Sequence, residues 1–237
     1  MLVQENNIIQ QMSVLPVMEA FYTIQGEGFH QGKAAYFIRL AGCDVGCSWC
    51  DVKESWNVEK HPIKTIKQII EEAKIAIRQQ TTTPNLQHQT PNIEQQTPNN
   101  KHQTLNICVI TGGEPCMHDL NELTINLKQH NFRTHLETSG AYPISGNFDW
   151  ICISPKKFKA PILENLKVAN ELKIIVFNKN DFSWAEEFAK KVSENCTLFL
   201  QPEWSKEKKM LPLIIDYIKE NPQWAMSIQL HKYIQVP

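Results

Sequence analysis

The sequence predicts an α/β fold in which a parallel sheet is flanked by helices. Short apolar runs rich in strand formers recur along the 237-residue chain, and helical patterns separate them. Continuous apolarity favours strands buried on both faces, as in parallel sheets. Strands that alternate with helices imply right-handed crossovers, in a sheet that is open or curled toward a barrel. Seven runs, one fewer than a closed eight-stranded barrel needs, span residues 35–40, 105–110, 133–137, 150–153, 171–177, 197–200 and 225–230.

Four helices are predicted between these strands. Thr65 can cap the first helix and Asp119 the second, and each helix carries an apolar stripe. Segments 183–194 and 206–220 also have a helical pattern. The stripe residues are Ile66, Ile69, Ile70, Ala73 and Ile77 in the first helix, and Leu120, Leu123 and Leu127 in the second.

We expect one catalytic domain over residues 1–237, interrupted by an insertion. Residues 79–104 are rich in Gln, Thr, Asn and Pro and contain few large apolar side chains. Such a segment cannot offset the entropy of ordering it, so the composition predicts a disordered loop. We assign this insertion no catalytic role.

Composition excludes some classes of function. The 24 Lys and Arg residues are balanced by 25 Asp and Glu residues, so no positive field exists to attract nucleic acid. No apolar run approaches the length of a membrane span, and residues 1–17 lack the pattern of a secretion signal. We therefore expect a cytoplasmic protein without membrane or nucleic-acid partners.

Three of the seven cysteines lie close together after the first predicted strand. Cys43, Cys47 and Cys50 are separated by three and then two residues, which favours metal or cluster binding over a disulfide framework. Three thiolates on a 4Fe–4S cluster would leave one iron open for another ligand. The alternative is a zinc site whose fourth ligand is His30, His61 or Cys116. We assign no ligand role to Cys116 or to the strand cysteines Cys108, Cys152 and Cys196.

Polar segments follow five of the predicted strands, where a parallel barrel places its active site. The first, residues 111–115, contains two adjacent glycines that let the backbone approach a ligand closely. A polar segment after one strand is common, but polar segments after five strands predict one cavity that all five line. They lie at residues 111–115, 137–140, 154–156, 201–204 and 229–232.

The cysteine triad resembles the signature of the radical S-adenosylmethionine (SAM) enzymes, in which an aromatic residue precedes the third cysteine as Trp49 does here. The Gly112–Gly113–Glu114–Pro115 segment resembles the motif that receives the SAM amino group in these enzymes. The resemblance implies that SAM is reduced at the open iron and cleaved to a 5′-deoxyadenosyl radical. It also implies an incomplete TIM-type barrel with helices outside.

Residues 21–28, ahead of the triad, resemble the 7-carboxy-7-deazaguanine synthase family, and the resemblance extends from Met18 to Pro237 around the insertion. It implies conversion of 6-carboxy-5,6,7,8-tetrahydropterin to 7-carboxy-7-deazaguanine with loss of ammonia, a carbon–nitrogen lyase reaction in queuosine biosynthesis. It also implies the cofactors SAM, a 4Fe–4S cluster and Mg²⁺, a homodimer, and a flavodoxin or ferredoxin as electron donor.

The same resemblance implies roles for individual residues. Arg39 would bind the substrate carboxylate, for which its planar fork is suited. We expect His231 and the carboxylate of Pro237 on the substrate side, so that a C-terminal tag would weaken substrate binding. The implied substrate residues are Ile24, Gln25, Gly26, Arg39, Thr111, His231 and Pro237, and the implied SAM residues are Trp49, Cys50, Asp51, Gly113, Ser154, Pro155, Lys156, Gln201, Pro202, Glu203 and Trp204.

One position departs from the family pattern. The family has a hydroxyl residue, a ligand for Mg²⁺, where this chain has Val52 after Asp51. Valine has no side-chain oxygen for a hard cation, so the protein ligand of Mg²⁺ is unknown. Two other functions remain open: a radical SAM activase that forms a glycyl radical on a protein, and a non-enzymatic zinc or electron-transfer module.

Overall fold

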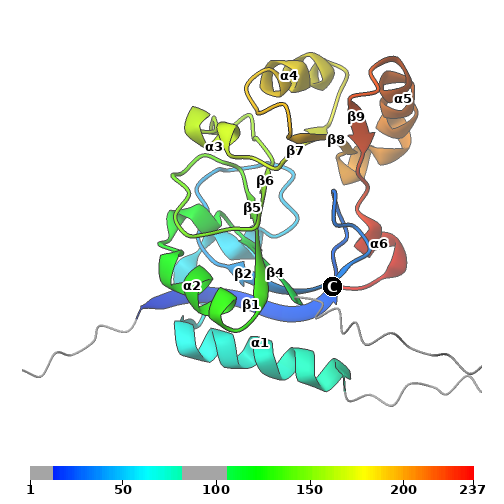
Figure 1. Cartoon of the computed structure of the whole chain (residues 1–237). Coiled ribbons are helices and arrows are strands. Elements are labelled where there is room, and N and C mark those ends of the chain that lie inside the picture. The colour runs from blue at the N-terminus through cyan, green and yellow to red at the C-terminus, as the bar shows by residue number, and fades with distance from the viewer. Residues whose placement is uncertain (1–12, 82–105) are drawn as a thin grey trace, which may run out of the picture.

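A computed structural model describes residues 13–81 and 106–237 (Figure 1). Within these ranges one sheet of nine strands has the order β3-β1-β2-β4-β5-β6-β7-β8-β9. Strands β2 and β4 to β9 run parallel, and β1 pairs antiparallel with β2 and β3. The strands are β1 (Val14–Ile24), β2 (Ala34–Leu40), β3 (Ile63–Thr65), β4 (Asn106–Gly112), β5 (Phe132–Thr138), β6 (Trp150–Ile153), β7 (Glu171–Val176), β8 (Thr197–Pro202) and β9 (Trp224–Met226).

The predicted incomplete barrel is confirmed, because the parallel strands form a curved sheet whose edge strands, β3 and β9, do not pair. Helices α1 to α5 lie on its outer side, and α6 lies at the gap between the sheet edges (Figure 1). Strands β1 and β3 were not predicted. The helices are α1 (Ile66–Thr81), α2 (Asn121–Gln129), α3 (Leu163–Lys167), α4 (Asn180–Ala189), α5 (Glu207–Glu220) and α6 (Leu230–Ile234), with 3-10 turns η1 (Lys53–Trp56), η2 (Val58–Lys60), η3 (Pro115–Met117) and η4 (Trp204–Lys206).

The predicted cap of α1 is confirmed. The Thr65 hydroxyl accepts a hydrogen bond from the backbone N–H of Gln68, 3.2 Å away, and the Gln68 side chain accepts one from the Thr65 N–H, at 2.8 Å. This reciprocal capping box satisfies two backbone donors at the helix start. The predicted stripe of α1 lies in the same apolar cluster as the outward side chains of β2 and β4.

Three predicted segment ends were wrong. The strand expected over residues 225–230 ends at Met226, and Leu230 begins α6. Helix α4 ends at Ala189 although the pattern extended to residue 194. Residues 79–81 of the predicted disordered insertion belong to α1, and the remainder of that prediction lies outside the described residues. No helix in the described ranges is long and apolar enough to cross a membrane.

The gap between the β1 side and the β9 side of the curved sheet is occupied by the β1–β2 loop and by α6 (Figure 1). The Leu230 N–H donates to the Gly26 carbonyl (2.9 Å), and the Gly28 N–H donates to the Ser227 hydroxyl (3.0 Å). These contacts join segments about 200 residues apart and bring the N-terminal loop beside the C-terminal helix.

Candidate functional site

The cysteine triad lies on the loop that follows β2. Gly42 and Gly46 have positive φ angles, of 105° and 74°, which L side chains rarely adopt. The Gly42 N–H donates to the Ser55 carbonyl (2.6 Å), so η1 fixes the start of the loop. The three thiols are free and partly buried, and they face one cavity.

The glycine pair after β4 packs against the beginning of this loop. A Cβ atom on Gly113 would lie 2.4 Å from the Gly42 carbonyl oxygen, and one on Gly112 would lie 2.1 Å from the Leu40 carbonyl oxygen. Both distances are too short for any side chain. These two positions therefore require glycine. Close backbone packing accounts for the two adjacent glycines of the motif.

Glu114 holds the next strand end in place. Its buried carboxylate accepts hydrogen bonds from the Thr138 hydroxyl (2.5 Å), and from the N–H (2.9 Å) and hydroxyl (2.5 Å) of Ser139. Four accepted bonds, including one from the Cys116 N–H (3.1 Å), satisfy a buried carboxylate well. The structure thus gives Glu114 a positioning role at the cavity wall.

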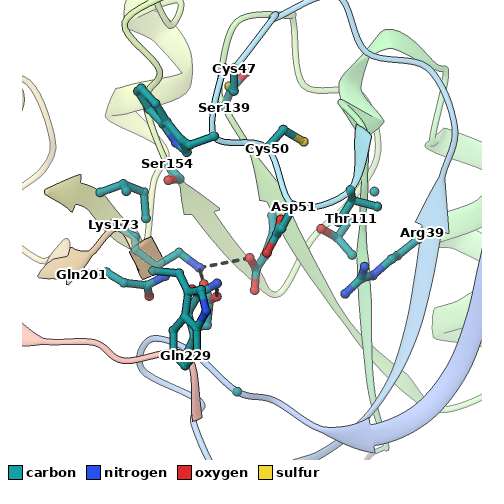
Figure 2. Close-up of a pocket in the computed structure, with 18 of the residues that line it drawn as sticks. Arg39, Cys47, Cys50, Asp51, Thr111, Ser139, Ser154, Lys173, Gln201 and Gln229 are labelled. Atoms are coloured by element: carbon teal, nitrogen blue, oxygen red, sulfur yellow. Dashed lines mark hydrogen bonds and ion pairs between the residues drawn. The ribbon is translucent and has the colours of Figure 1, made fainter. Parts of the chain in front are cut away.

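The predicted strand-end residues meet around a cavity of about 390 Å³ (Figure 2). In Figure 2, Cys47 and Cys50 lie on one side of the cavity and Gln229 lies on the other. Pro155 is the one predicted site residue outside its lining. The predicted residues that line it are Ile24, Gln25, Gly26, Arg39, Cys43, Cys47, Trp49, Cys50, Asp51, Thr111, Gly113, Ser154, Lys156, Gln201, Pro202, Glu203, Trp204, His231 and Pro237.

The expected SAM side of the cavity combines aromatic and polar groups. The Trp49 ring lies 5.1 Å from that of Phe158 and 5.8 Å from that of Phe177. The Lys156 ammonium donates to the Ser154 hydroxyl (2.6 Å), and burial lowers the pKa of Lys156. A flat apolar wall beside hydrogen-bonding groups suits a nucleoside with a charged amino-acid end.

The expected substrate side contains Arg39, whose Nη1 lies 3.3 Å from Glu19 Oε1 and whose guanidinium lies over the Phe21 ring. His231 lies against Gly26, where a Cβ atom would be 2.3 Å from the His231 ring. Gln235 has a left-handed conformation, with φ of 56°, and ends α6. The chain after it bends back, so that Pro237 lines the cavity.

Sequence reasoning missed an ion network in the cavity wall. The buried Lys173 ammonium lies 2.5 Å from Glu27 Oε2 and 3.1 Å from Glu137 Oε2. Gln25 donates to Glu137 (2.8 Å), and Gln229 donates to Glu27 (3.0 Å). The signal was present, because Glu171, Lys173 and Ile175 alternate with apolar residues along β7 and so point inward.

This network keeps its charges despite burial. Burial opposes ionisation of Glu27, but the Lys173 ammonium outweighs it and lowers the pKa of Glu27 to about 2. Burial also opposes charge on Lys173, and Glu137 and Glu27 raise its pKa well above the usual value. The wall therefore holds the Lys173 ammonium against the ionised Glu27 at neutral pH, with Glu137 on the other side of the ammonium.

The thiol triad fits an iron–sulfur cluster. Burial raises the pKa of the Cys43 and Cys47 thiols, and neighbouring thiols add to the effect, so these groups need nearby positive charge to ionise. Iron supplies that charge, and thiolates are its usual cluster ligands. His30, His61 and Cys116, which could have completed a zinc site, do not line this cavity.

The expected Mg²⁺ ligand does not fit in the same way. Val52 lines the cavity and offers no side-chain oxygen. Its exposed neighbour Asp51 is paired with Lys232, at 3.2 Å. The described residues thus lack the hydroxyl ligand that the family places after this aspartate.

Relatives of the chain carry one name. A curated 7-carboxy-7-deazaguanine synthase from Flavobacterium psychrophilum is 48% identical over the whole of both chains. One from Synechocystis is 43% identical, over 93% of each chain.

A solved structure agrees with these relatives. The crystal structure of QueE from Escherichia coli superposes with a TM-score of 0.71 at 28% identity, covering 92% of this chain and 95% of the other. No family model matches the chain. The full-length identity, together with the fold, shows that the chain belongs to the 7-carboxy-7-deazaguanine synthase family.

Proposed function

We propose that this protein is a radical SAM lyase that converts 6-carboxy-5,6,7,8-tetrahydropterin to 7-carboxy-7-deazaguanine with loss of ammonia, in the queuosine pathway. Family membership supports the reaction. The observation that carries the proposal is the single cavity, in which the thiol triad faces residues suited to a charged pterin. No observation favours an activase or a non-enzymatic module.

The proposal gives each side of the cavity a task. When bound, the 4Fe–4S cluster held by Cys43, Cys47 and Cys50 and the SAM beside it would supply a radical that abstracts substrate hydrogen. Trp49 and the strand-end groups from Ser154 and Gln201 onward orient SAM. The SAM contacts carried over from the family are Trp49, Cys50, Asp51, Gly113, Ser154, Pro155, Lys156, Gln201, Pro202, Glu203 and Trp204.

On the substrate side, Arg39 pairs with the carboxylate and Thr111 contacts the ring. The β1–β2 loop supplies Ile24, Gln25 and Gly26, and His231 and Pro237 complete this wall. Gln25 and Glu137 are hydrogen bonded to each other, so the edge presented to the pterin is fixed before substrate arrives. Mg²⁺ would bind through substrate and water together with a ligand other than residue 52, because Val52 has no side-chain oxygen.

Partners and location are part of the same proposal. A flavodoxin or ferredoxin supplies the electron, and the enzyme acts as a homodimer. All seven cysteines are free, which suits the reducing cytoplasm, where thiols persist. Analytical ultracentrifugation of the anaerobic holoenzyme measures the oligomeric state.

The decisive experiment compares Cys47→Ala with Cys196→Ala. Cys196 comes just before β8, packs in an apolar cluster and does not line the cavity. Anaerobically reconstituted protein is incubated with SAM, dithionite and the pterin, and products are analysed by mass spectrometry. We expect 7-carboxy-7-deazaguanine from the unmodified protein and from Cys196→Ala, and none from Cys47→Ala. Cleavage of SAM without this product would reject the substrate, and no cleavage by a reducible cluster would reject the chemistry.

A matched pair of tags tests Pro237. Residues added after Pro237 would extend into the cavity that it lines. We expect the pterin KM to rise for a C-terminal tag and to stay unchanged for an N-terminal tag. Equal KM values for the two proteins would remove Pro237 from the substrate site.

A further inference from the structure

A second, smaller cavity lies inside the barrel beside the main one. Its volume is about 10 Å³, which is roughly what one water molecule requires. Gln25, Glu27 and Glu137 line both cavities, so the hydrogen-bonded wall between them is one side chain thick. The inner cavity is also lined by His30, His135, Leu136, Trp150, Cys152 and Glu171.

Two buried histidines face this cavity without partners. His30 is 6% exposed and His135 is 2% exposed. Both ring nitrogens of His30, and Nε2 of His135, have no hydrogen-bond partner in the described part of the chain. A buried polar atom left unpaired costs about 1–3 kcal/mol, so three such atoms at one cavity point to a bound molecule that is able to pair with them.

The two rings are held in place by their surroundings. Their centroids are 4.4 Å apart, and the Trp150 ring lies 4.7 Å from that of His30. Glu171 accepts hydrogen bonds from the Phe29 N–H (3.2 Å) and from Trp150 Nε1 (3.1 Å), both at Oε2. The two imidazoles therefore pack against each other and His30 packs against Trp150, while Oε2 of the facing Glu171 already accepts two hydrogen bonds.

Both histidines are neutral at physiological pH. Burial, with smaller contributions from Lys33 and Arg133, lowers the pKa of His30 to about 4. Burial, followed by His30 and Arg133, lowers the pKa of His135 to about 3. Asp149 opposes this at His135. Burial raises the pKa of the facing Glu171 carboxyl. A neutral imidazole both donates and accepts, so each ring can pair with a water on either nitrogen.

We propose that the inner cavity binds one internal water, and that this water joins His30, His135 and Glu171 into a hydrogen-bonded relay that positions Glu137 on the floor of the substrate pocket. The proposal rests on the proposed function, because it gives Glu137 a substrate to face. His30 and His135 act through Glu137 and are positioning residues.

The first test is a crystal structure of the anaerobic holoenzyme at high resolution. We expect one ordered water within hydrogen-bond distance of His135 Nε2. A dry cavity, or imidazoles bonded to protein atoms instead, would overturn the proposal. This readout needs no turnover, so it stands apart from the proposed function.

The second test compares His135→Leu, which removes the nitrogen, with His135→Gln, which keeps a hydrogen-bonding group. The control is His130→Gln, since His130 is exposed and its ring bonds only to the Asn126 carbonyl (2.9 Å). We expect kcat to fall about tenfold or more in His135→Leu, to recover partly in His135→Gln and to be unchanged in the control, with the pterin KM constant, because a displaced Glu137 disturbs the geometry of the chemical step.

The outcomes separate the two proposals. If the unmodified enzyme forms no product, the proposed function fails while the crystal test still decides the water. If the unmodified enzyme is active and both His135 variants keep its kcat, the relay is wrong. If His135→Leu does not fold, His30→Leu replaces it with the same expected loss of kcat, and an unchanged kcat there rejects the relay.

Discussion

The two halves of the barrel interior differ sharply although one sheet forms both. On β1, β2 and β4 most inward side chains are apolar and form a small cluster, although Arg39 and Thr111 near the strand ends line the main cavity. On β5, β7 and β8 polar and charged side chains predominate and line the two cavities, with Ile175 as an apolar exception. The apolar set is Phe21, Ala35, Phe37, Ile107 and Val109, and the polar set is His135, Glu137, Glu171, Lys173 and Gln201.

The outer face of the sheet shows no such division. Ile38, Ile110 and Leu136 pack in one apolar cluster, and Leu172 and Ile174 in another. The outer layers stabilise the fold, so the interior of the polar half is free to hold charge. The comparison teaches that stability depends on shape in the apolar half, and on complete pairing of charges in the polar half.

Removing Lys173 should give the largest effect. In Lys173→Met, Glu27 and Glu137, whose side chains are 16% and 24% exposed, lose their ammonium partner, and breaking a mostly buried ion pair in this way costs up to about 3–5 kcal/mol. Urea unfolding at pH 7 measures the loss. Lys190→Met, at an exposed lysine of the same half, is the control and should be nearly neutral. Equal losses in the two variants would contradict the pairing argument.

Truncating Phe37 should cost about 3 kcal/mol, because a buried phenylalanine leaves a void when it is replaced by alanine. The ring is 8% exposed and stacks on Phe21 with centroids 5.6 Å apart. The loss in Phe37→Ala should be the same at pH 7 and pH 4. A loss that varies with pH would mean that the apolar half also depends on charge.

Acid should lower the stability of the polar half within a defined range of pH. The pKa of Glu27 falls from 4.5 to about 2 on folding, so its contribution to stability is complete above pH 4.5 and is lost as the pH drops toward 2. We expect the unfolding midpoint of Glu27→Gln to depend less on pH in this window than that of the unmodified protein. Glu122→Gln, on the surface of α2, should retain the full dependence.

The smallest expected difference in stability is between alanine variants at two glycines of the β1–β2 loop. Gly28 and Gly32 both have positive φ, so alanine at either position costs about 1–2 kcal/mol of backbone strain. A Cβ atom on Gly28 would also lie 2.0 Å from Glu171 Oε1, whereas one on Gly32 meets no atom within 4 Å. The melting temperature of Gly28→Ala should therefore be lower than that of Gly32→Ala. The reverse order would show that the Glu171 side chain moves away from the added Cβ atom without loss of stability.

The parallel strands and the cavity could be predicted from sequence, because continuous apolar runs and polar strand ends are local signals. Strand β1 could not, since Pro16 and Glu19 interrupt its pattern and its pairing with β2 is set by tertiary contacts. The end of β9 was missed because the Ser227 hydroxyl bonds to Gln201, a partner 26 residues away that no local pattern shows.

In the site, too, features with a local sequence signal could be predicted and features set by tertiary contacts could not. Cysteine spacing and the glycine pair are fixed by local chemistry and were predicted. Lys173 was missed because a lysine within an apolar run gives no hint of its partners, Glu27 and Glu137, which come from a loop and another strand. The unpaired nitrogens of His30 and His135 likewise become visible only when both rings are placed.

The closure of the barrel by the β1–β2 loop has a consequence for biosynthesis. Gly28 bonds to Ser227, 199 residues later, and at about 5–20 residues per second the ribosome needs roughly 10–40 seconds to make that interval. Glu137 and Lys173, the partners of Gln25 and Glu27, are made earlier, but the loop lacks its contact with Ser227 throughout that time. High contact order of this kind slows folding, and the site is completed only after the last helix leaves the ribosome.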